Sequence, residues 1–120
     1  MLRVHVENIG EMAVIDCEGR IVQSEAAFKL RRAVHAQRHA RIIVLDLSEV
    51  SAIEGGGLGM LMFVQRWAHD HDIRLKLFNP RQSVRERLDE VSSMREFDIA
   101  TFDEMMAILV WADRRYARAA

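Results

Sequence analysis

The sequence lacks the features that would place this protein outside the cell or inside a membrane. Its single cysteine, Cys17, cannot form an internal disulfide bond. No stretch approaches the about 18 consecutive apolar residues that a membrane-spanning helix requires. The first ten residues contain no apolar segment of signal-peptide length. We therefore expect a cytoplasmic protein with no direct membrane insertion.

An excess of charge of either sign is also missing. The chain has 17 Lys and Arg residues against 18 Asp and Glu residues, which gives a formal net charge of −1. This balance does not favour nucleic acid or an acidic membrane as a partner, and it leaves a protein or a small ligand. With 120 residues, half of them hydrophobic, the chain is long enough to form one domain, residues 1–120, without disulfides or a structural metal.

The alternation of apolar and polar residues predicts the strands. Residues 4–6 and 11–17 have this pattern on either side of a turn at 8–10, which indicates an antiparallel hairpin. The branched apolar run at 41–47 predicts a central strand that is covered on both faces. Residues 73–78 alternate cleanly, and 97–100 form a short extended piece.

Four helices are expected between and after these strands. The first covers 24–37 with Ser24 as its N-cap, and the second covers 58–72. Asn79 and Pro80 are read as the cap and first residue of a third helix. Thr101 and Glu104 have the spacing of a capping box at the start of a fourth. The order predicts an α/β domain with a mixed, mostly parallel sheet of about five strands and about four helices.

The most informative stretch is "AIEGGGLG" at 52–59, a glycine turn between the central strand and the second helix. A helix N-terminus at such a place favours an anion. However, no Lys-Ser/Thr pair follows the glycines, and Met60 stands where a dinucleotide fingerprint has its third glycine. The turn therefore either allows close packing or forms a binding surface, and we expect no enzymatic activity. If the turn needs a positive φ at Gly57, a bulky residue at that position would be strained.

The histidines, the cysteine and the methionines have simpler structural interpretations. The pairs His35 with His39 and His69 with His71 have no third ligand at a zinc-like spacing, so solvated histidines and no metal are expected. No cofactor is expected either. Cys17 lies on a predicted strand without an activating partner, which favours an inert buried thiol. The methionines at positions 60, 62, 105 and 106 are read as core residues, with a partner surface as the alternative.

The stretch "VLDLSEVSAIEGGGLGMLM" at 44–62 resembles the STAS domain family, and in particular bacterial anti-sigma factor antagonists. Those proteins have a strand that ends in Asp-Leu-Ser, a loop of the form Asp-Ser-Ser/Ala-Gly-Leu-Gly, and then a helix. The stretches "GRIVQSEA" at 19–26 and "FDIATFDE" at 97–104 support the resemblance. It implies a single cytoplasmic domain in which helices pack against a sheet.

The resemblance also implies a switch that this chain lacks. In the family, phosphorylation of the second loop serine inactivates the antagonist. An alignment through Leu58 and Gly59 places Gly56 at that phosphoacceptor position, Gly55 at the preceding serine and Glu54 at the family aspartate. Glycine has no hydroxyl group, so phosphorylation there is impossible. Ser48 and Ser51 are nearby hydroxyls. Ser48 is interpreted as a turn or loop hydrogen-bonding residue, with phosphorylation at either serine as the alternative.

By this resemblance the protein would bind an anti-sigma factor or serine kinase through the 51–59 loop. The alternative is a STAS accessory subunit that contacts the ATPase of a membrane transporter, such as a lipid ABC system. The expected partner-binding residues are Ser24, Ser51, Glu54, Gly55, Gly56, Gly57, Leu58 and Gly59.

Overall fold

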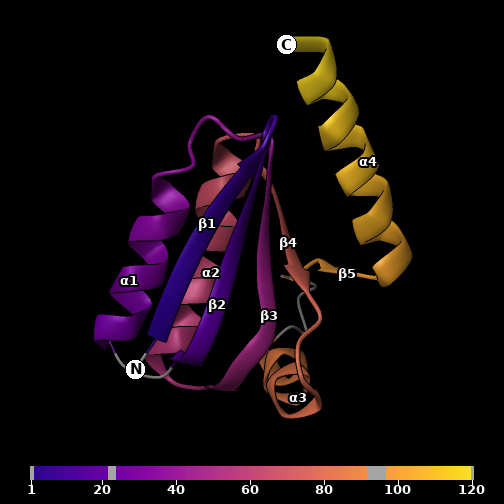
Figure 1. Cartoon of the computed structure of the whole chain (residues 1–120). Coiled ribbons are helices and arrows are strands. Elements are labelled where there is room, and N and C mark those ends of the chain that lie inside the picture. Colours follow the sequence, from indigo (N-terminus) through magenta and orange to yellow (C-terminus); the bar gives the residue numbers. More distant parts are fainter. Residues whose placement is uncertain (1, 22–23, 92–96, 120) are drawn as a thin grey trace.

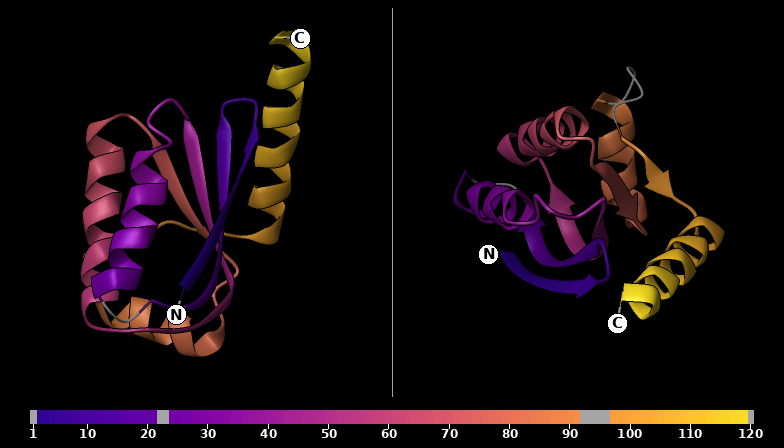
Figure 2. Two further views of the ribbon diagram at one scale, coloured as in Figure 1. Left: turned by 60° about the vertical axis from the view of Figure 1, so that its left-hand side comes forward. Right: turned by 90° about the horizontal axis from the view of Figure 1, so that it is seen from above.

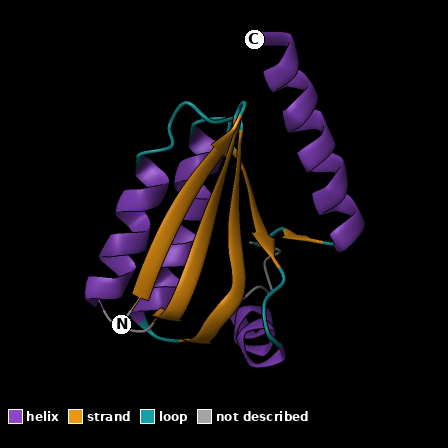
Figure 3. Cartoon of the chain, viewed as in Figure 1, coloured by secondary structure: helices purple, strands orange, loops and turns teal. Residues whose placement is uncertain are grey.

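The computed structural model describes residues 2–21, 24–91 and 97–119, without the side chains of 24–25, 91 and 114–119. Within these residues, a mixed five-stranded sheet packs with four helices in a single domain, as predicted (Figures 1 and 3). The elements in chain order are β1 Leu2–Ile9, β2 Met12–Ile21, α1 Ser24–His35, β3 Ile42–Ile53, α2 Gly56–Asp70, β4 Arg74–Phe78, α3 Gln82–Val91, β5 Ile99–Ala100 and α4 Phe102–Ala119.

The strands lie in the sheet in the order in which they occur in the sequence, β1-β2-β3-β4-β5. The β1–β2 hairpin is antiparallel, and every later pair is parallel. Gly10 has a φ of 59° in the hairpin turn, a conformation that glycine adopts without strain. The predicted hairpin and parallel crossovers are therefore confirmed.

Helices cover both faces of the sheet, so its central strands are buried on two sides. In Figure 2, α1 and α2 lie together on one face and α4 lies on the other. The main core forms beneath α1 and α2 and includes Ile15, Leu45 and Leu77. A smaller core beneath α4 consists of Met12, Ile42, Val44, Met105 and Ala112. This two-sided burial explains why β3 begins with four consecutive apolar residues.

Strand β3 is longer than the sequence predicted, because the expected loop after residue 47 continues the strand to Ile53. The extension contains two register shifts against β2, one between Asp16 and Glu18 and one between Gly19 and Arg20. Each shift places two residues of β3 opposite one residue of β2, which is a β-bulge. Gly19, which takes part in the second shift, lies within β2 and has a φ of 118°.

The helix starts confirm some predicted caps and correct others. Thr101 and Glu104 form the predicted capping box: each backbone N–H donates to the other's side chain at 3.1 Å. The Thr101 hydrogen bonds lower the pKa of the Glu104 carboxyl. The prediction for α3 was wrong, because Asn79 has a φ of 53° and the helix begins two residues after Pro80, at Gln82.

Helix α4 is attached to the sheet by a buried lysine. Lys76 points from β4 to the α4 side and is 4% exposed. Its ammonium lies 2.8 Å from the Asp98 carboxylate and 3.9 Å from that of Glu104. Both carboxylates belong to the β5–α4 segment, so the ion pairs join that segment to β4. A buried ammonium requires such partners because burial removes its hydration.

We predict that Asp98→Asn destabilises the protein by about 1–3 kcal/mol, because it leaves the buried Lys76 charge poorly compensated. The measurement is urea unfolding followed by circular dichroism. Glu90→Gln is the matched control, since it removes the exposed Arg87–Glu90 pair at 2.8 Å, and we expect it to cost less than about 0.5 kcal/mol. Equal effects of the two variants would contradict this role for Asp98.

Candidate functional site

The candidate site lies where the carboxyl ends of β2 and β3 meet the N-terminus of α2. This edge of the sheet is the lower edge in Figure 1, and the N-terminus of α1 lies beside it. The β2–β3 ladder continues to its last pair, Ile21 with Ile53. In open α/β sheets the carboxyl ends of the strands are the usual place for function.

The glycine turn is much shorter than the sequence predicted. Ser51 belongs to β3, and only Glu54 and Gly55 separate this strand from α2, which already begins at Gly56. Gly55 is the N-cap residue, with a φ of 52° and a ψ of −120° and no side-chain cap. Its carbonyl accepts the N–H groups of Leu58 and Gly59 at 3.1 and 3.3 Å. The expected 51–59 loop is therefore the end of a strand, a two-residue connection and a helical turn.

Gly57 is required for a close contact rather than for a positive φ. The turn does not need a positive φ at this position, because within this turn the residue with a positive φ is Gly55. A Cβ atom added at Gly57 would lie 1.9 Å from the carbonyl oxygen of Ile21. The same oxygen accepts the N–H of Glu54 at 3.2 Å. The first turn of α2 thus lies directly against the end of β2.

The neighbouring glycines lie at the surface of the protein instead. Gly55, Gly56 and Gly59 are exposed, and a Cβ atom added at any of them would meet nothing within 4 Å. Positions 56, 59 and 63 share one side of the helix because they are spaced by three and four residues. The N-terminal half of α2 therefore presents bare backbone to solvent.

Exposed apolar side chains continue this surface along α2. Met62 is 37% exposed and Phe63 is 46% exposed. We call Gly55, Gly56, Gly59, Met62 and Phe63 the exposed α2 face. The Phe63 ring makes a cation–π contact with α1, because the Arg31 guanidinium lies over it at 4.5 Å from the ring centroid.

Phe28 adds a further apolar side chain on α1, which packs beside α2, and it is 54% exposed. Large exposed apolar residues that lie close together commonly mark interaction surfaces.

The methionines follow the core prediction only in part. Met105 is buried, and Met60 packs against the main core. The core reading was wrong for Met62 and for Met106, which is 44% exposed. The periodicity of α2 could have indicated the outward position of Met62, but the front of that helix is apolar on nearly every side.

The remaining predicted site residues have different surroundings. Leu58 and Gly57 are buried, whereas Glu54 is exposed. The Ser51 hydroxyl donates a hydrogen bond to the Gly19 carbonyl at 3.3 Å. Ser24 is the first residue of α1, and its predicted N-cap hydrogen bond lies outside the described side chains.

Ser48 lies in β3 rather than in a loop, at the first bulge. Its hydroxyl donates to the Asp46 carboxylate at 2.7 Å, and its backbone N–H donates to the same oxygen at 3.0 Å. The expectation that Ser48 serves as a hydrogen-bonding residue is confirmed. A phosphate there would face the negative charge of Asp46.

The cysteine has no features of a reactive site. Cys17 is buried, and this burial, followed by the charges of Asp46 and Asp16, raises the pKa of its thiol to about 12. The predicted buried thiol is confirmed, and it stays protonated at neutral pH.

The histidines do not form a metal site within the described residues, where no cluster of His, Cys, Asp or Glu could hold a metal ion. His39 and His69 are exposed as expected. His35 is only partly exposed: its ring lies 4.6 Å from that of Trp67, and burial, followed by the charge of Arg31, lowers its pKa.

A family model described as "Mlab, STAS domain" matches residues 4–106. The chain belongs to the STAS domain family. Among the described helices, none is both long and apolar enough to cross a bilayer. No curated protein matches this STAS domain.

Solved structures of anti-sigma factor antagonists share its fold. Unphosphorylated SpoIIAA is 18% identical, with a TM-score of 0.73, and the match covers 91% of this chain and 97% of SpoIIAA. An antagonist from Mycobacterium paratuberculosis is 18% identical, with a TM-score of 0.76 and coverage of 92% and 95%. The murine anion transporter Slc26a9 is 13% identical, with a TM-score of 0.69, over 88% of this chain but only 18% of the transporter.

We predict that Gly57→Ala destabilises this STAS domain by about 1–3 kcal/mol, because the new methyl group must displace the Ile21 carbonyl or the whole helix. Gly59→Ala is the matched control: it lies two positions along the same helix with open space around it, and we expect a gain of about 0.5–1 kcal/mol from helix propensity. Thermal and urea unfolding give both values. A neutral Gly57→Ala would show that the close approach is not required.

Proposed function

We propose that this STAS domain is a protein-binding module whose exposed α2 face docks a regulatory partner of the anti-sigma factor or serine kinase type. The observation that supports it is a helix start with bare backbone at Gly55, Gly56 and Gly59, continued by Met62 and Phe63. A surface without side chains lets a partner backbone or helix approach closely, and the apolar side chains supply buried area. The activity is binding rather than catalysis, and it takes place in the cytoplasm.

The proposed binding residues fall into two groups. Gly55, Gly56 and Gly59, with Glu54 and Ser51 at the edge, are exposed and available for contact. Gly57 and Leu58 are buried and act by holding α2 on the sheet. Ser24 begins α1 at the same edge of the sheet.

The proposed module is not switched by phosphorylation at position 56. Gly56 has no hydroxyl, although the space around it would accept a side chain. A phosphate there would add about −1.5 to −2 charges to a docking surface. Without that possibility the domain binds constitutively, or its binding is set by its abundance and by competition. SpoIIAA, by contrast, has been solved in a phosphorylated form.

A second candidate is an accessory subunit of a membrane transporter, with a transporter ATPase as the docked partner. The family model that matches residues 4–106 is described as "Mlab, STAS domain" and not as an anti-sigma factor antagonist, which leaves this candidate open beside the first. The structural likeness to a segment of Slc26a9 is a further observation in its favour. The same exposed α2 face would serve either partner, so the identity of the captured protein separates the two candidates.

We predict that Met62→Glu abolishes partner capture, because it places a charge in the apolar part of the exposed α2 face. Met106→Glu is the matched control, since Met106 is similarly exposed but lies on α4. The tagged wild type and both variants are used to capture proteins from lysate of the source organism, and the retained protein is identified by mass spectrometry. Equal capture by Met62→Glu and the wild type would exclude the exposed α2 face as the docking surface. An anti-sigma factor or kinase supports the first candidate, and a transporter ATPase supports the second.

We also predict that Gly56→Ser folds normally and accepts phosphate from an anti-sigma factor kinase that binds the wild type. The residue is helical and an added Cβ atom is free of contacts. Gly55→Ser is the control, because it adds the same hydroxyl one position earlier. The φ of 52° at Gly55 strains any side chain there, so this variant should be less stable than Gly56→Ser. Incorporation of radiolabelled phosphate gives the result. Binding without incorporation at position 56 would show that the turn no longer presents this position to the kinase.

A further inference from the structure

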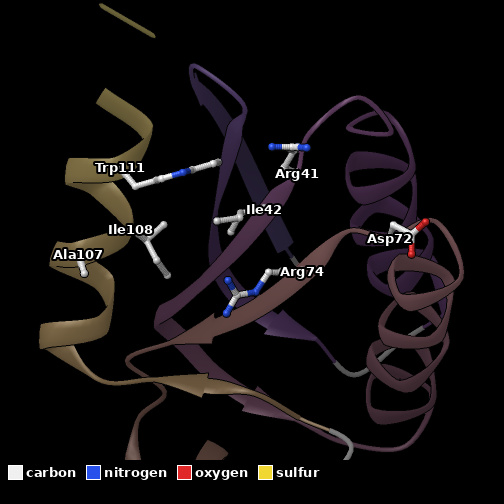
Figure 4. A pocket seen from close by; sticks show the side chains of 7 residues that line it. All are labelled: Arg41, Ile42, Asp72, Arg74, Ala107, Ile108 and Trp111. Carbon is white, nitrogen blue, oxygen red and sulfur yellow. The ribbon is translucent and has the colours of Figure 1, made fainter. Parts of the chain in front are cut away.

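A cavity lies on the opposite side of the sheet from the exposed α2 face, between α4 and the starts of β3 and β4 (Figure 4). The cavity has a volume of about 470 Å³, within the range of small-molecule sites. It is lined by Arg41, Ile42, Asp72, Arg74, Ala107, Ile108 and Trp111. We call it the α4 cavity.

The α4 cavity has a cationic side formed by two neighbouring strand starts. Arg41 precedes β3 and Arg74 opens β4, and the Arg74 backbone N–H donates to the Arg41 carbonyl at 2.9 Å. The Arg74 charge also acts on Glu104 of α4: the Thr101 hydrogen bonds, followed by the charges of Lys76 and Arg74, lower the pKa of that carboxyl. Two residues farther along β4, Lys76 is compensated by Asp98 and Glu104. The cavity therefore contains two positive charges against one lining carboxylate, that of Asp72.

The facing side of the α4 cavity is apolar. Ile42 belongs to the smaller core, and the partly buried side chains of Ile108 and Trp111 on α4 pack against that core. In Figure 4, Ile108 and Trp111 extend from α4 toward the sheet, and the Arg74 side chain extends from β4 toward α4. A molecule between them would touch hydrocarbon and an aromatic ring on one side and guanidinium groups on the other.

We propose that the α4 cavity binds a small organic anion that carries a carboxylate or phosphate group on an apolar, ring-sized body. Guanidinium groups pair with both anions through two parallel hydrogen bonds. Ile42, Ile108 and Trp111 then cover the apolar body, which a simple inorganic anion does not have. The cavity is separate from the exposed α2 face, so this proposal does not depend on the proposed partner.

The experiment is isothermal titration calorimetry of the purified chain with 2-naphthoate and 2-naphthyl phosphate. The neutral 2-naphthalenemethanol tests the need for charge, and inorganic phosphate and acetate test the need for the apolar body. We expect saturable binding of one or both naphthyl anions at one site, and binding at least about tenfold weaker for the other three compounds. The stronger of the two anions identifies the head group.

Two variants locate the site. Arg41→Gln combined with Arg74→Gln should weaken binding at least about tenfold through loss of charge-assisted hydrogen bonds. Ala107→Phe should block the cavity, since Ala107 is an exposed lining residue. Arg66→Gln on α2 and Val110→Phe on the outer side of α4 are the matched controls and should bind as the wild type does. Circular dichroism verifies that each variant is folded.

The proposal is overturned if neither naphthyl anion binds at millimolar concentration. It is equally overturned if the neutral alcohol binds as tightly as the anions, or if the double arginine variant binds them as the wild type does.

Discussion

The contact between Gly57 and the carbonyl of Ile21 is the constraint on which the candidate site depends. It places the first turn of α2 against the last residue of β2, where even a methyl group would collide. Because α2 is held in this position, Gly57 and Leu58 face the core while Gly55, Gly56 and Gly59 face solvent. One buried glycine thus determines which of its neighbours can meet a partner.

A different kind of interaction holds the other face of the sheet. Helix α4 begins with a reciprocal cap between Thr101 and Glu104, and Lys76 pairs with Asp98 and Glu104 beneath it. These contacts hold the start of the helix, while Met105 and Ala112 form the small core farther along. The α4 cavity opens beside that core, at the edge of the sheet opposite the glycine turn. The two surfaces for which we propose binding roles are therefore separate from each other in the fold.

Under the proposed function, the glycine at position 56 and the exposure of Met62 and Phe63 have one physical consequence. A switchable site must tolerate a charged group, which limits how much apolar surface a partner can bury beside it. A site without the hydroxyl has no such limit. The exposed α2 face combines a helix start without side chains with exposed apolar residues, and this is the arrangement from which we propose binding that is not switched at position 56.

Local patterns in the sequence determined much of this structure. The alternation at residues 73–78 and the Thr101–Glu104 spacing depend on neighbouring residues, and both predictions were confirmed. The glycine turn was recognisable as the candidate site for the same reason. The extension of β3 to Ile53 could not be predicted from the sequence. Its bulges arise from pairing with β2, a segment about 30 residues earlier in the chain.

Long-range packing also decided the roles of single residues. Sequence alone indicated that Gly57 was special, but the steric reason required the position of Ile21. The outward position of Met62 and the meeting of Arg41, Arg74 and Trp111 likewise depend on how helices lie on the sheet. Sequence determines which residues can form a turn, a cap or a strand, since these depend on local backbone chemistry. Tertiary structure decides which of them are buried and which meet, because those contacts join segments that are distant in the chain.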